Sequence, residues 1–445
     1  MKILVIGSGG REHALAWRLL RDAGVEHLWC VPGNGGMAGL TGAECLAVPP
    51  GGLTDVAALA ALGERLRPDV TLVGPELPLV SGIADEFERR GLRVVGPSKA
   101  AAQLEGSKAF AKEFLLRNKI PTGPLYGIFD SAGDAYSALC AVDWPCVIKA
   151  DGLAAGKGVL VASTPDDATA FIDRLMVARE FGAAGDRVLL EEALRGPELS
   201  YIVLTDGEAI LPLVPTRDHK RVFDGNRGPN TGGMGAYSTD DLVAGDLEER
   251  ILGTIVRPTL EAMAREGHPY RGFLYAGLML TSDGPQVLEF NCRMGDPETQ
   301  AIVVRMDFHL AEALQAAAEG RLREISARWK PGASACVVMA AAGYPGEPRT
   351  GMKIGGLEAA ADVRDTVVFH AGTTLQNGDV VVSGGRVLGV TAIGADLATA
   401  VARAYEAVGK ISFDGAHSRR DIGASSGTAA VSGASGGAGT PPRRG

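Results

Sequence analysis

Residues 2–17 read KILVIGSGGREHALAW: an apolar run ends at a glycine turn, and a helical pattern follows. A short apolar strand that enters a glycine turn and then a helix is typical of a parallel sheet covered on both faces. The stretches DVTLVGPE (69–76) and LRVVGPS (92–98) repeat the strand-then-turn pattern. We therefore predict an α/β fold with a parallel sheet in residues 1–102. Ligands should lie beyond the carboxyl ends of its strands.

The glycine turn matches the dinucleotide fingerprint G-x-G-x-x-G poorly. Gly7 and Gly9 fit, but Glu12 stands where the third glycine would allow close helix–strand packing. The second strand ends in VPGN (31–34), without the acidic residue that would bind a ribose. These departures argue against an NAD-dependent oxidoreductase. A helix N-terminus still suits an anion, and Arg11 lies in its first turn, so a single phosphate ester fits better than a pyrophosphate. A purely structural turn is the alternative.

Length and composition exclude several classes of protein. A chain of 445 residues is too long for one core, so we expect several domains. The net charge of -9 argues against a general nucleic-acid binder, which needs a basic surface. No apolar run is long enough to span a bilayer, no secretion signal is visible, and the 6 cysteines lack CxxC spacing. We expect a cytoplasmic protein with buried, reduced thiols and no membrane or nucleic-acid partner.

The pattern along the rest of the chain divides it further. Residues 101–120 read as a linking helix, and about 122–195 as a compact α/β lobe within a larger unit, 103–330. A β-rich segment begins near Ala333, so we assign 331–423 to a small C-terminal domain. Residues 424–445 consist mostly of Gly, Ser, Ala, Thr and Pro, and we expect this tail to be disordered.

The stretch VIKADGLAAGKGV (147–159) is a candidate phosphate-binding loop. Lys149 ends an apolar strand, and Lys157 lies among small residues that let the backbone approach a phosphate. It is not a Walker loop, because Gly158 follows Lys157 where Ser or Thr is required. A plain turn is the alternative, which two lysines at this spacing make less attractive.

Acidic residues follow in VLLEEALRGPELS (188–200). A strand that leaves into a hinge could offer backbone groups to a flat base, and a carboxylate among Glu191, Glu192 and Glu198 could bind ribose hydroxyls. The alternative is a solvated charge cluster, and the neighbouring lysine loop is what favours the binding role.

The stretch VLEFNCRMGDPETQ (287–300) is the candidate metal site. Alternate side chains of a strand share a face, so Glu289 and Asn291 should point the same way and Phe290 the opposite way. Two oxygen ligands on one rigid strand suit Mg²⁺, which completes its shell with water and phosphates. Arg293 continues this face and could meet an anion. The alternative is an edge strand with a polar face.

Eight of these stretches occur in the same order in one known family. They are VIGSGGREHALAW (5–17), VGPELPLVSG (73–82), QLEGSKAF (103–110), VIKADGLAAGKGV (147–159), DHKR (218–221), GPNTGGMGAYS (228–238), GFLYAGLM (272–279) and EFNCRMGDPETQ (289–300). Over about residues 1–423 the chain resembles the phosphoribosylamine–glycine ligase family of the ATP-grasp superfamily. The resemblance implies a pre-ATP-grasp N-terminal domain, a two-lobed ATP-grasp core and a small C-terminal domain. It implies a monomer.

The resemblance also implies a reaction in de novo purine synthesis. ATP, glycine and 5-phosphoribosylamine would give glycinamide ribonucleotide, ADP and phosphate through a glycyl phosphate. Phosphoryl transfer needs charge neutralisation and alignment more than covalent catalysis. The absence of a recognisable serine triad or reactive cysteine agrees with this.

By resemblance, individual residues receive roles. Lys108 and Lys149 would hold ATP phosphates, with Lys157 in a covering loop at 152–158 that is mobile without ATP. Adenosine would contact Glu191, the backbone of Leu194 and Glu198, and Mg²⁺ or Mn²⁺ would bind Glu289 and Asn291. The 5-phosphoribosylamine would lie against Gly9, Gly10, Asn34 and Glu76. Glycine would lie near Asp218, Asn230, Thr231, Gly232 and Gly233, with its carboxylate paired to Arg293. Lys149 and Arg293 would be the catalytic residues.

One departure from the superfamily pattern concerns the metal. Many ATP-grasp enzymes carry a metal-binding carboxylate on the strand before the Glu-x-Asn strand, and the corresponding stretch FLYAGLML (273–280) has none. The metal shell should therefore depend more on water and phosphate. Two further hypotheses stay open. The chain could be another ATP-grasp carboxylate–amine ligase, or it could be an inactive nucleotide-binding protein. The second would require the loss of a lysine or a metal ligand, yet Lys149, Glu289 and Asn291 are all present.

Overall fold

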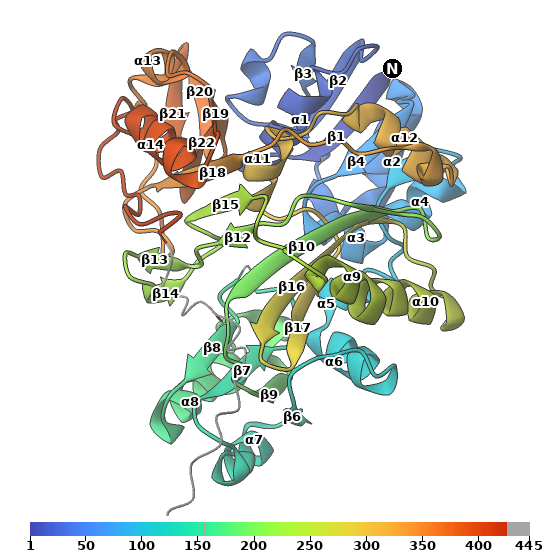
Figure 1. Cartoon of the computed structure of the whole chain (residues 1–445), viewed down its shortest axis with the longest axis vertical. Coiled ribbons are helices and arrows are strands. Elements are labelled where there is room, and N and C mark those ends of the chain that lie inside the picture. Colours follow the sequence, from blue (N-terminus) through green and yellow to red (C-terminus); the bar gives the residue numbers. More distant parts are fainter. Residues whose placement is uncertain (155, 425–445) are drawn as a thin grey trace, which may run out of the picture.

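The structure is a computed structural model that describes residues 1–154 and 156–424. In Figure 1 the N-terminal sheet and the C-terminal domain lie side by side at one end of the molecule. A central antiparallel sheet follows, and a small α/β lobe forms the opposite end. The predicted α/β class, with parallel N-terminal sheet and β-rich C-terminal domain, is confirmed.

The N-terminal domain is built on a parallel sheet of order β3-β2-β1-β4-β5. Its strands and helices are β1 (Lys2–Gly7), α1 (Gly10–Leu19), β2 (His27–Pro32), β3 (Ala43–Cys45), α2 (Val56–Leu66), β4 (Val70–Val73), α3 (Glu76–Ser81), α4 (Ile83–Arg89) and β5 (Val94–Val95). All residues of β1 after Lys2 are buried, as expected for a central strand covered on both faces. The glycine turn after β1 therefore lies at the carboxyl edge of the sheet.

The linking segment differs from the single helix expected over 101–120. It forms two helices, α5 (Gln103–Gly106) and α6 (Lys108–Arg117), because Ser107 is extended between them. The Ser107 hydroxyl accepts the N–H of Phe110 and so caps α6. Because the helix is interrupted at Ser107, the Lys108 side chain points toward the lobe formed by residues 122–195.

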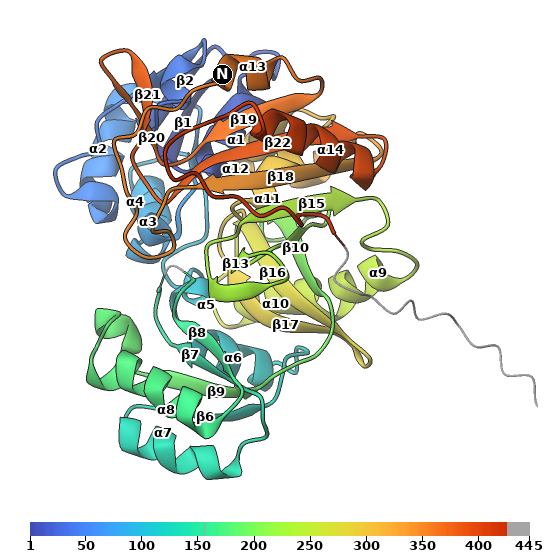
Figure 2. The same ribbon diagram turned by 90° about the vertical axis from the view of Figure 1, so that its left-hand side faces the viewer.

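That lobe, which we call the lid lobe, has its own sheet and core. The sheet order is β6-β9-β7-β8, with β6 (Leu125–Phe129), β7 (Cys146–Ala150), β8 (Val159–Ala162) and β9 (Val188–Glu192). Helices α7 (Ala132–Ala138) and α8 (Pro165–Ile172) cover one face (Figure 2). The buried apolar residues from Ala135 to Leu190 form a cluster separate from the two large cores. A lobe with a separate core can move as a unit.

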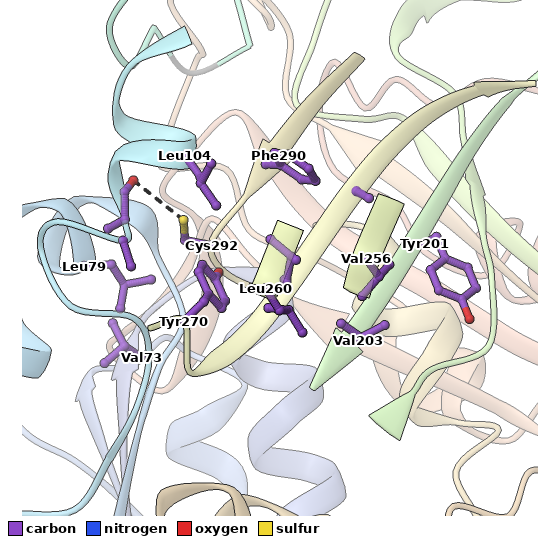
Figure 3. Packing of buried hydrophobic residues seen from close by; sticks show 14 of the residues in the cluster. Val73, Leu79, Leu104, Tyr201, Val203, Val256, Leu260, Tyr270, Phe290 and Cys292 are labelled. Atoms are coloured by element: carbon purple, nitrogen blue, oxygen red, sulfur yellow. Dashed lines mark hydrogen bonds between the residues drawn. The ribbon is translucent and has the colours of Figure 1, made fainter. Parts of the chain in front are cut away.

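The central sheet, of order β11-β10-β16-β17, joins the lid lobe to the N-terminal domain. Its elements are β10 (Glu198–Thr205), β11 (Ile210–Pro212), α9 (Leu247–Ile251), α10 (Arg257–Arg265), β16 (Gly272–Thr281) and β17 (Gly284–Asn291). Figure 3 shows Leu104, Phe290 and Cys292 in the core beside it. The Cys292 thiol donates to the carbonyl of Ala102 at 3.6 Å, which ties the end of β17 to the α5 segment.

A further sheet crosses the boundary that we expected at residue 330. Its order is β12-β15-β18-β22-β19, from β12 (Arg217–Asp218) and β15 (Gly235–Thr239) to β18 (Ala333–Ala340), β19 (Thr366–His370) and β22 (Arg386–Gly394). Smaller elements are β13 (Arg221–Phe223), β14 (Arg227–Asn230), α11 (Glu298–Val303), α12 (Leu310–Glu319), α13 (Leu357–Ala361), β20 (Thr373–Gln376), β21 (Asp379–Val382) and α14 (Leu397–Val408). The shared sheet brings the start of β22 beside residues 231–233.

The N- and C-terminal domains meet at a pair of buried histidines. The His13 Nδ1 accepts the backbone N–H of His370 at 2.8 Å, and their rings lie 5.5 Å apart. A Cβ added to Gly36 would overlap both rings, so only glycine fits there. Burial lowers the pKa of His13 to about 3, helped by His370, and that of His370 to about 4.

This pair predicts an acid-sensitive domain interface. When the pKa of a histidine is lower in the folded protein than in the unfolded chain, protonation favours the unfolded chain. The free energy of unfolding therefore falls as the pH drops below the unfolded-state pKa of about 6.5. Between pH 7 and 5 we expect a loss of about 2 kcal/mol for each histidine, measured by urea unfolding at each pH. His13→Asn keeps an acceptor without a titrating ring and should show a shallower loss. Equal pH profiles in the variant and the parent protein would contradict this assignment.

The expectation that the cysteine thiols are buried is confirmed only in part. Cys30, Cys146, Cys292 and Cys336 are buried and free, whereas Cys45 is partly exposed and Cys140 is exposed. Cys140 is exposed because it lies on a short turn after α7 at the surface of the lid lobe. In the described part of the chain, no helix has the length and hydrophobicity needed to cross a membrane. The tail expected to be disordered lies outside the described residues, apart from Ala424.

Candidate active site

A cavity of about 520 Å³ lies where the three domains and the lid lobe meet. Twelve of the residues singled out by the sequence line it: Gly9, Glu76, Lys108, Lys149, Glu191, Asp218, Asn230, Thr231, Gly232, Glu289, Asn291 and Arg293. They come from elements separated by up to 284 residues, so the fold assembles them. The cavity is large enough for a nucleotide and a small second substrate.

Six singled-out residues are not among the described lining residues: Gly10, Asn34, Lys157, Leu194, Glu198 and Gly233. The Asn34 amide is used inside the protein, since it donates to the carbonyls of Ser8 and His370 and accepts the N–H groups of Gly36 and Met37. It ties the glycine turn to the C-terminal domain. The loop 152–158 includes residue 155, which lies outside the described residues, so its expected mobility stays a prediction.

Two lysines converge on one carboxylate at the lid side of the cavity. The Lys149 ammonium lies 2.9 Å and the Lys112 ammonium 3.1 Å from the same oxygen, Oε2, of Glu191. Lys149 also donates to the carbonyl of Leu288 at 3.0 Å. Burial opposes the charge of Glu191, but Lys149 and Lys112 lower its pKa. Glu191 therefore stays ionised and holds both ammonium groups in place.

Glu289 lies at the centre of a ring of cations. Burial opposes its ionised form, but Lys220, Lys149 and Lys108 together lower its pKa. Burial in turn lowers the pKa of Lys108, whose ammonium donates to the carbonyl of Gly152 at 3.1 Å. Three ammonium groups thus face Glu289, and two of them, Lys149 and Lys220, are also paired with Glu191 and Glu198.

The predicted metal ligands fit a hard divalent cation. Glu289 and Asn291 border the cavity, while Phe290 between them is buried in the core, although its edge also reaches the cavity. No group of three or more His, Cys, Asp or Glu side chains within residues 1–154 and 156–424 could hold a metal ion by itself. A pair of oxygen ligands completed by water and phosphate is the arrangement that Mg²⁺ prefers. Gly277, opposite Glu289 on β16, adds no ligand.

Asp218 and Lys220 form the side of the cavity next to Glu289. Burial raises the pKa of Asp218 to about 8, and the charges of Glu298, Glu198 and Glu289 act in the same direction. Lys220 lies 2.7 Å from Glu198 and 3.9 Å from Glu289. Burial opposes its charge, yet these carboxylates raise its pKa. At neutral pH Asp218 therefore carries a proton and Lys220 is charged.

Arg293 is held by acidic residues on two sides. Its guanidinium lies 2.8 Å from Glu105 and 3.6 Å from Glu76, and it donates to the Asn291 side-chain oxygen at 3.3 Å. Burial opposes its charge, but Glu105 and Glu76 raise its pKa. Its Nε is the atom that faces Glu76, and this buried nitrogen makes no hydrogen bond within the described residues.

Glu12 explains why the opening turn departs from the dinucleotide fingerprint. Its carboxylate accepts the N–H of Gly9 and pairs with Arg11, and both side chains are buried. A Cβ added at Gly7 would lie 2.5 Å from Glu12 Cγ, and one at Gly74 would overlap Oε1. The glycines of the turn therefore make room for a glutamate. This carboxylate occupies the helix N-terminus, where a pyrophosphate would otherwise bind.

We predict that Glu12→Ala lowers the free energy of unfolding by about 3 kcal/mol, because it leaves the buried Arg11 guanidinium without its partner. Urea unfolding measures the change. Glu12→Gln keeps the acceptor for the Gly9 N–H and should cost less. An unchanged unfolding curve for the alanine variant would show that Arg11 finds another partner.

Arg386 at the start of β22 brings the C-terminal domain to the cavity. One amino group, NH1, donates to the carbonyls of Gly232 and Asp296, each at 2.6 Å, and the other lies 3.3 Å from the Asp296 carboxylate. Asp296 also accepts the Gln300 amide at 2.8 Å, and burial opposes its charge while Arg386 and Arg11 lower its pKa. The Tyr344 hydroxyl accepts the N–H of Gly232 at 3.0 Å. The C-terminal domain thus fixes the 231–233 loop.

The sequence analysis did not identify several lining residues. They are Arg11 as a buried ion-pair partner, Glu105, Lys112, Lys220, Tyr275, Asp296, Glu298 and Arg386. Lys112 could have been found, because it lies four residues after Lys108 and therefore on the same face of α6. Arg386 could not, because nothing local connects its strand to residues 231–233.

Comparison with known proteins gives the same picture for all three domains. Residues 1–105, 106–299 and 334–425 match the N, ATP-grasp (A) and C domains described as phosphoribosylglycinamide synthetase. The chain is 50% identical to the phosphoribosylamine–glycine ligase of Escherichia coli O157:H7 over 425 residues, which cover 95% of this chain and 98% of that protein. It is 49% identical to the enzyme of the same name from Allochromatium vinosum, with the same coverage.

Solved structures agree with this. The crystal structure of phosphoribosylamine–glycine ligase from Thermotoga maritima superposes with a TM-score of 0.79 at 31% identity, covering 95% of this chain and all of that one. The crystal structure of a biotin carboxylase–beta-gamma-ATP complex from Campylobacter jejuni shares the fold with a TM-score of 0.69 at 16% identity, covering 94% of this chain and 92% of that one. The three domain matches and the identity over nearly the whole length show that the chain belongs to the phosphoribosylglycinamide synthetase family, the phosphoribosylamine–glycine ligases.

Proposed function

We propose that this enzyme uses ATP to join glycine to 5-phosphoribosylamine, which yields glycinamide ribonucleotide, ADP and phosphate in de novo purine synthesis. The observation that carries the proposal is the single cavity in which Lys108, Lys149, Glu289, Asn291 and Arg293 meet. A cation ring around a metal-binding carboxylate suits the terminal phosphates of ATP, and the nearby polar residues suit an amino acid.

The first chemical step activates the carboxylate of glycine. One carboxylate oxygen attacks the γ-phosphorus of ATP, the bond to the β-phosphate oxygen breaks, and ADP leaves. Lys108 and Lys149, with Lys157 from the covering loop, would neutralise the phosphate charge and align the groups, which is the main need of phosphoryl transfer. A divalent ion, Mg²⁺ or Mn²⁺, held by Glu289 and Asn291 would supply further charge neutralisation when bound.

The second step forms the amide bond. The amine of 5-phosphoribosylamine attacks the acyl carbon, phosphate leaves with its bridging oxygen, and the nitrogen loses a proton. Arg293 would orient the glycine carboxylate, and Asp218 would face the amino group. An ammonium placed beside Asp218 favours its ionised form, so glycine binding would lower the raised pKa. The phosphosugar would lie at Gly9, Gly10 and Glu76, with Asn34 shaping the turn.

The adenosine end of ATP would lie near Glu191, the backbone of Leu194 and Glu198. Both ion pairs of Glu191 within the described residues use Oε2, so Oε1 would be the oxygen that binds a ribose hydroxyl. We place the reaction in the cytoplasm, with small-molecule substrates and a monomeric enzyme. Size-exclusion chromatography with light scattering tests the last point.

Phosphate release tests the proposed function. With ATP and Mg²⁺, phosphate should appear only when both glycine and 5-phosphoribosylamine are present, and mass spectrometry should find glycinamide ribonucleotide. Replacing glycine by other small amino acids separates this activity from another ATP-grasp carboxylate–amine ligase. Release that ignores glycine would refute the proposal, as would product formation only with a different acid.

A further inference from the structure

A second cavity, of about 330 Å³, lies at the opposite end of α1 from the active site. We call it the rear cavity. It is lined by Trp17, Arg18 and Arg21 from the end of α1, and by Arg328, Lys330 and Asp307 from the segments around α12. Arg11 and Arg18 lie seven residues apart on α1, about 10 Å along the helix axis. No role in the proposed reaction involves these residues.

The charges of the rear cavity are not balanced by the protein. Four cationic side chains line it against the single carboxylate of Asp307, in a chain whose net charge is -9. The ion pairs that the described residues form here involve only Asp22, which lies 2.6 Å from Arg18 and 3.4 Å from His309. Asp22 also accepts the N–H of Ala311, so it serves the start of α12.

A buried donor in this cavity lacks a partner. Arg18 is only 8% exposed, and its terminal amino groups are bound by Asp22 and the carbonyl of Phe308. Its Nε is buried and has no hydrogen-bond partner among the described residues. A buried N–H without an acceptor is unfavourable, and an anion bound at this point would supply the missing acceptor.

Arg21 shows the same lack of negative charge. Its guanidinium lies 3.8 Å from the centre of the Trp17 ring and donates to the Trp17 carbonyl at 2.9 Å. Burial lowers the pKa of Arg21, and the positive charge of Arg18 adds to this. Arg18 is paired with Asp22, whereas Arg21 forms no ion pair with a carboxylate among the described residues.

We propose that the rear cavity binds a small molecule carrying a multiply charged phosphate group. Guanidinium groups offer paired donors that match phosphate oxygens. Four cationic side chains against the carboxylates of Asp307 and Asp22 leave two net positive charges, which favour a phosphate over a monocarboxylate. The Trp17 face is already covered by Arg21, so recognition rests on the phosphate rather than on stacking of a base.

Titration calorimetry with pyrophosphate tests the proposal on the full chain. The parent protein should bind two equivalents, one in each cavity, and Arg328→Glu combined with Lys330→Glu should lose one of them or weaken it at least tenfold. Arg65→Glu with Lys410→Glu makes the same change in net charge at exposed positions elsewhere and should keep both. Glycine-dependent phosphate release should be unchanged in both variants.

The same titration separates this proposal from the proposed function. If the active site bound no pyrophosphate, the parent protein would bind one equivalent and the Arg328/Lys330 variant none. An unchanged binding curve in that variant would overturn the proposal, and so would citrate binding as tightly as pyrophosphate. Competition by AMP against inorganic phosphate then distinguishes a nucleotide from free phosphate, and a crystal soaked with pyrophosphate should show density beside Arg18 Nε.

Discussion

Replacing Glu289 by alanine should lower kcat at least about 10³-fold while the protein still folds. The carboxylate is partly exposed at the cavity wall, so its removal leaves little apolar core disturbed. It removes a negative charge that faces Lys220, Lys149 and Lys108, and with it one of the two proposed metal ligands. Loss of a group that stabilises transition-state charge costs about 10²–10³ in kcat, and loss of a metal ligand adds to this.

The measurement is glycine-dependent phosphate release as a function of Mg²⁺ concentration. Glu289→Gln keeps the shape and one oxygen, so it separates the charge from the packing and should recover part of the activity at high Mg²⁺. Thermal unfolding of both variants checks the fold. Near-normal activity of Glu289→Ala at limiting Mg²⁺ would refute the metal assignment.

The parts of the fold that the sequence predicted are those carried by local patterns. The apolar run of β1 and its glycine turn predicted the parallel sheet. The alternation in 289–291 predicted that Glu289 and Asn291 share one face, because a strand has a period of two, although Phe290 also lines the cavity. The family resemblance then ordered these pieces into three domains. The break at Ser107 was missed because it depends on a single extended residue inside a helical pattern.

The parts that were not predicted depend on contacts between distant segments. The glycines of the opening turn were interpreted as space for phosphate, yet in the structure they receive the Glu12 side chain. The Asn34 amide is satisfied by backbone groups that include His370, more than 300 residues away. Polar groups buried at a domain junction form hydrogen bonds with the backbone groups that the fold places next to them. The sequence of one segment does not reveal which backbone groups these will be.

Arg386→Ala should lower kcat/KM for glycine about 10²-fold and leave the affinity for ATP nearly unchanged. The guanidinium binds two carbonyls of different segments and the Asp296 carboxylate, so its loss frees the 231–233 loop at the proposed glycine site. A misplacement of about 1 Å in a positioning element can cost a factor of about 10². Lys108 and Lys149, which we propose hold the ATP phosphates, contact the Gly152 carbonyl, Glu191 and the Leu288 carbonyl rather than the 231–233 loop, so they should keep these contacts.

Steady-state kinetics with each substrate varied in turn measure this, together with ATP binding by calorimetry. Arg386→Lys keeps the charge but has one nitrogen in place of two, so it cannot bind the two carbonyls and the Asp296 carboxylate together as the planar guanidinium does, and it should resemble the alanine variant. Arg403→Ala, which removes an ion pair with Asp365 in the same domain, is the matched control and should keep activity. A merely structural role for Arg386 would lower stability and affect all substrates alike. A loss confined to glycine would show that the C-terminal domain completes the amino-acid site.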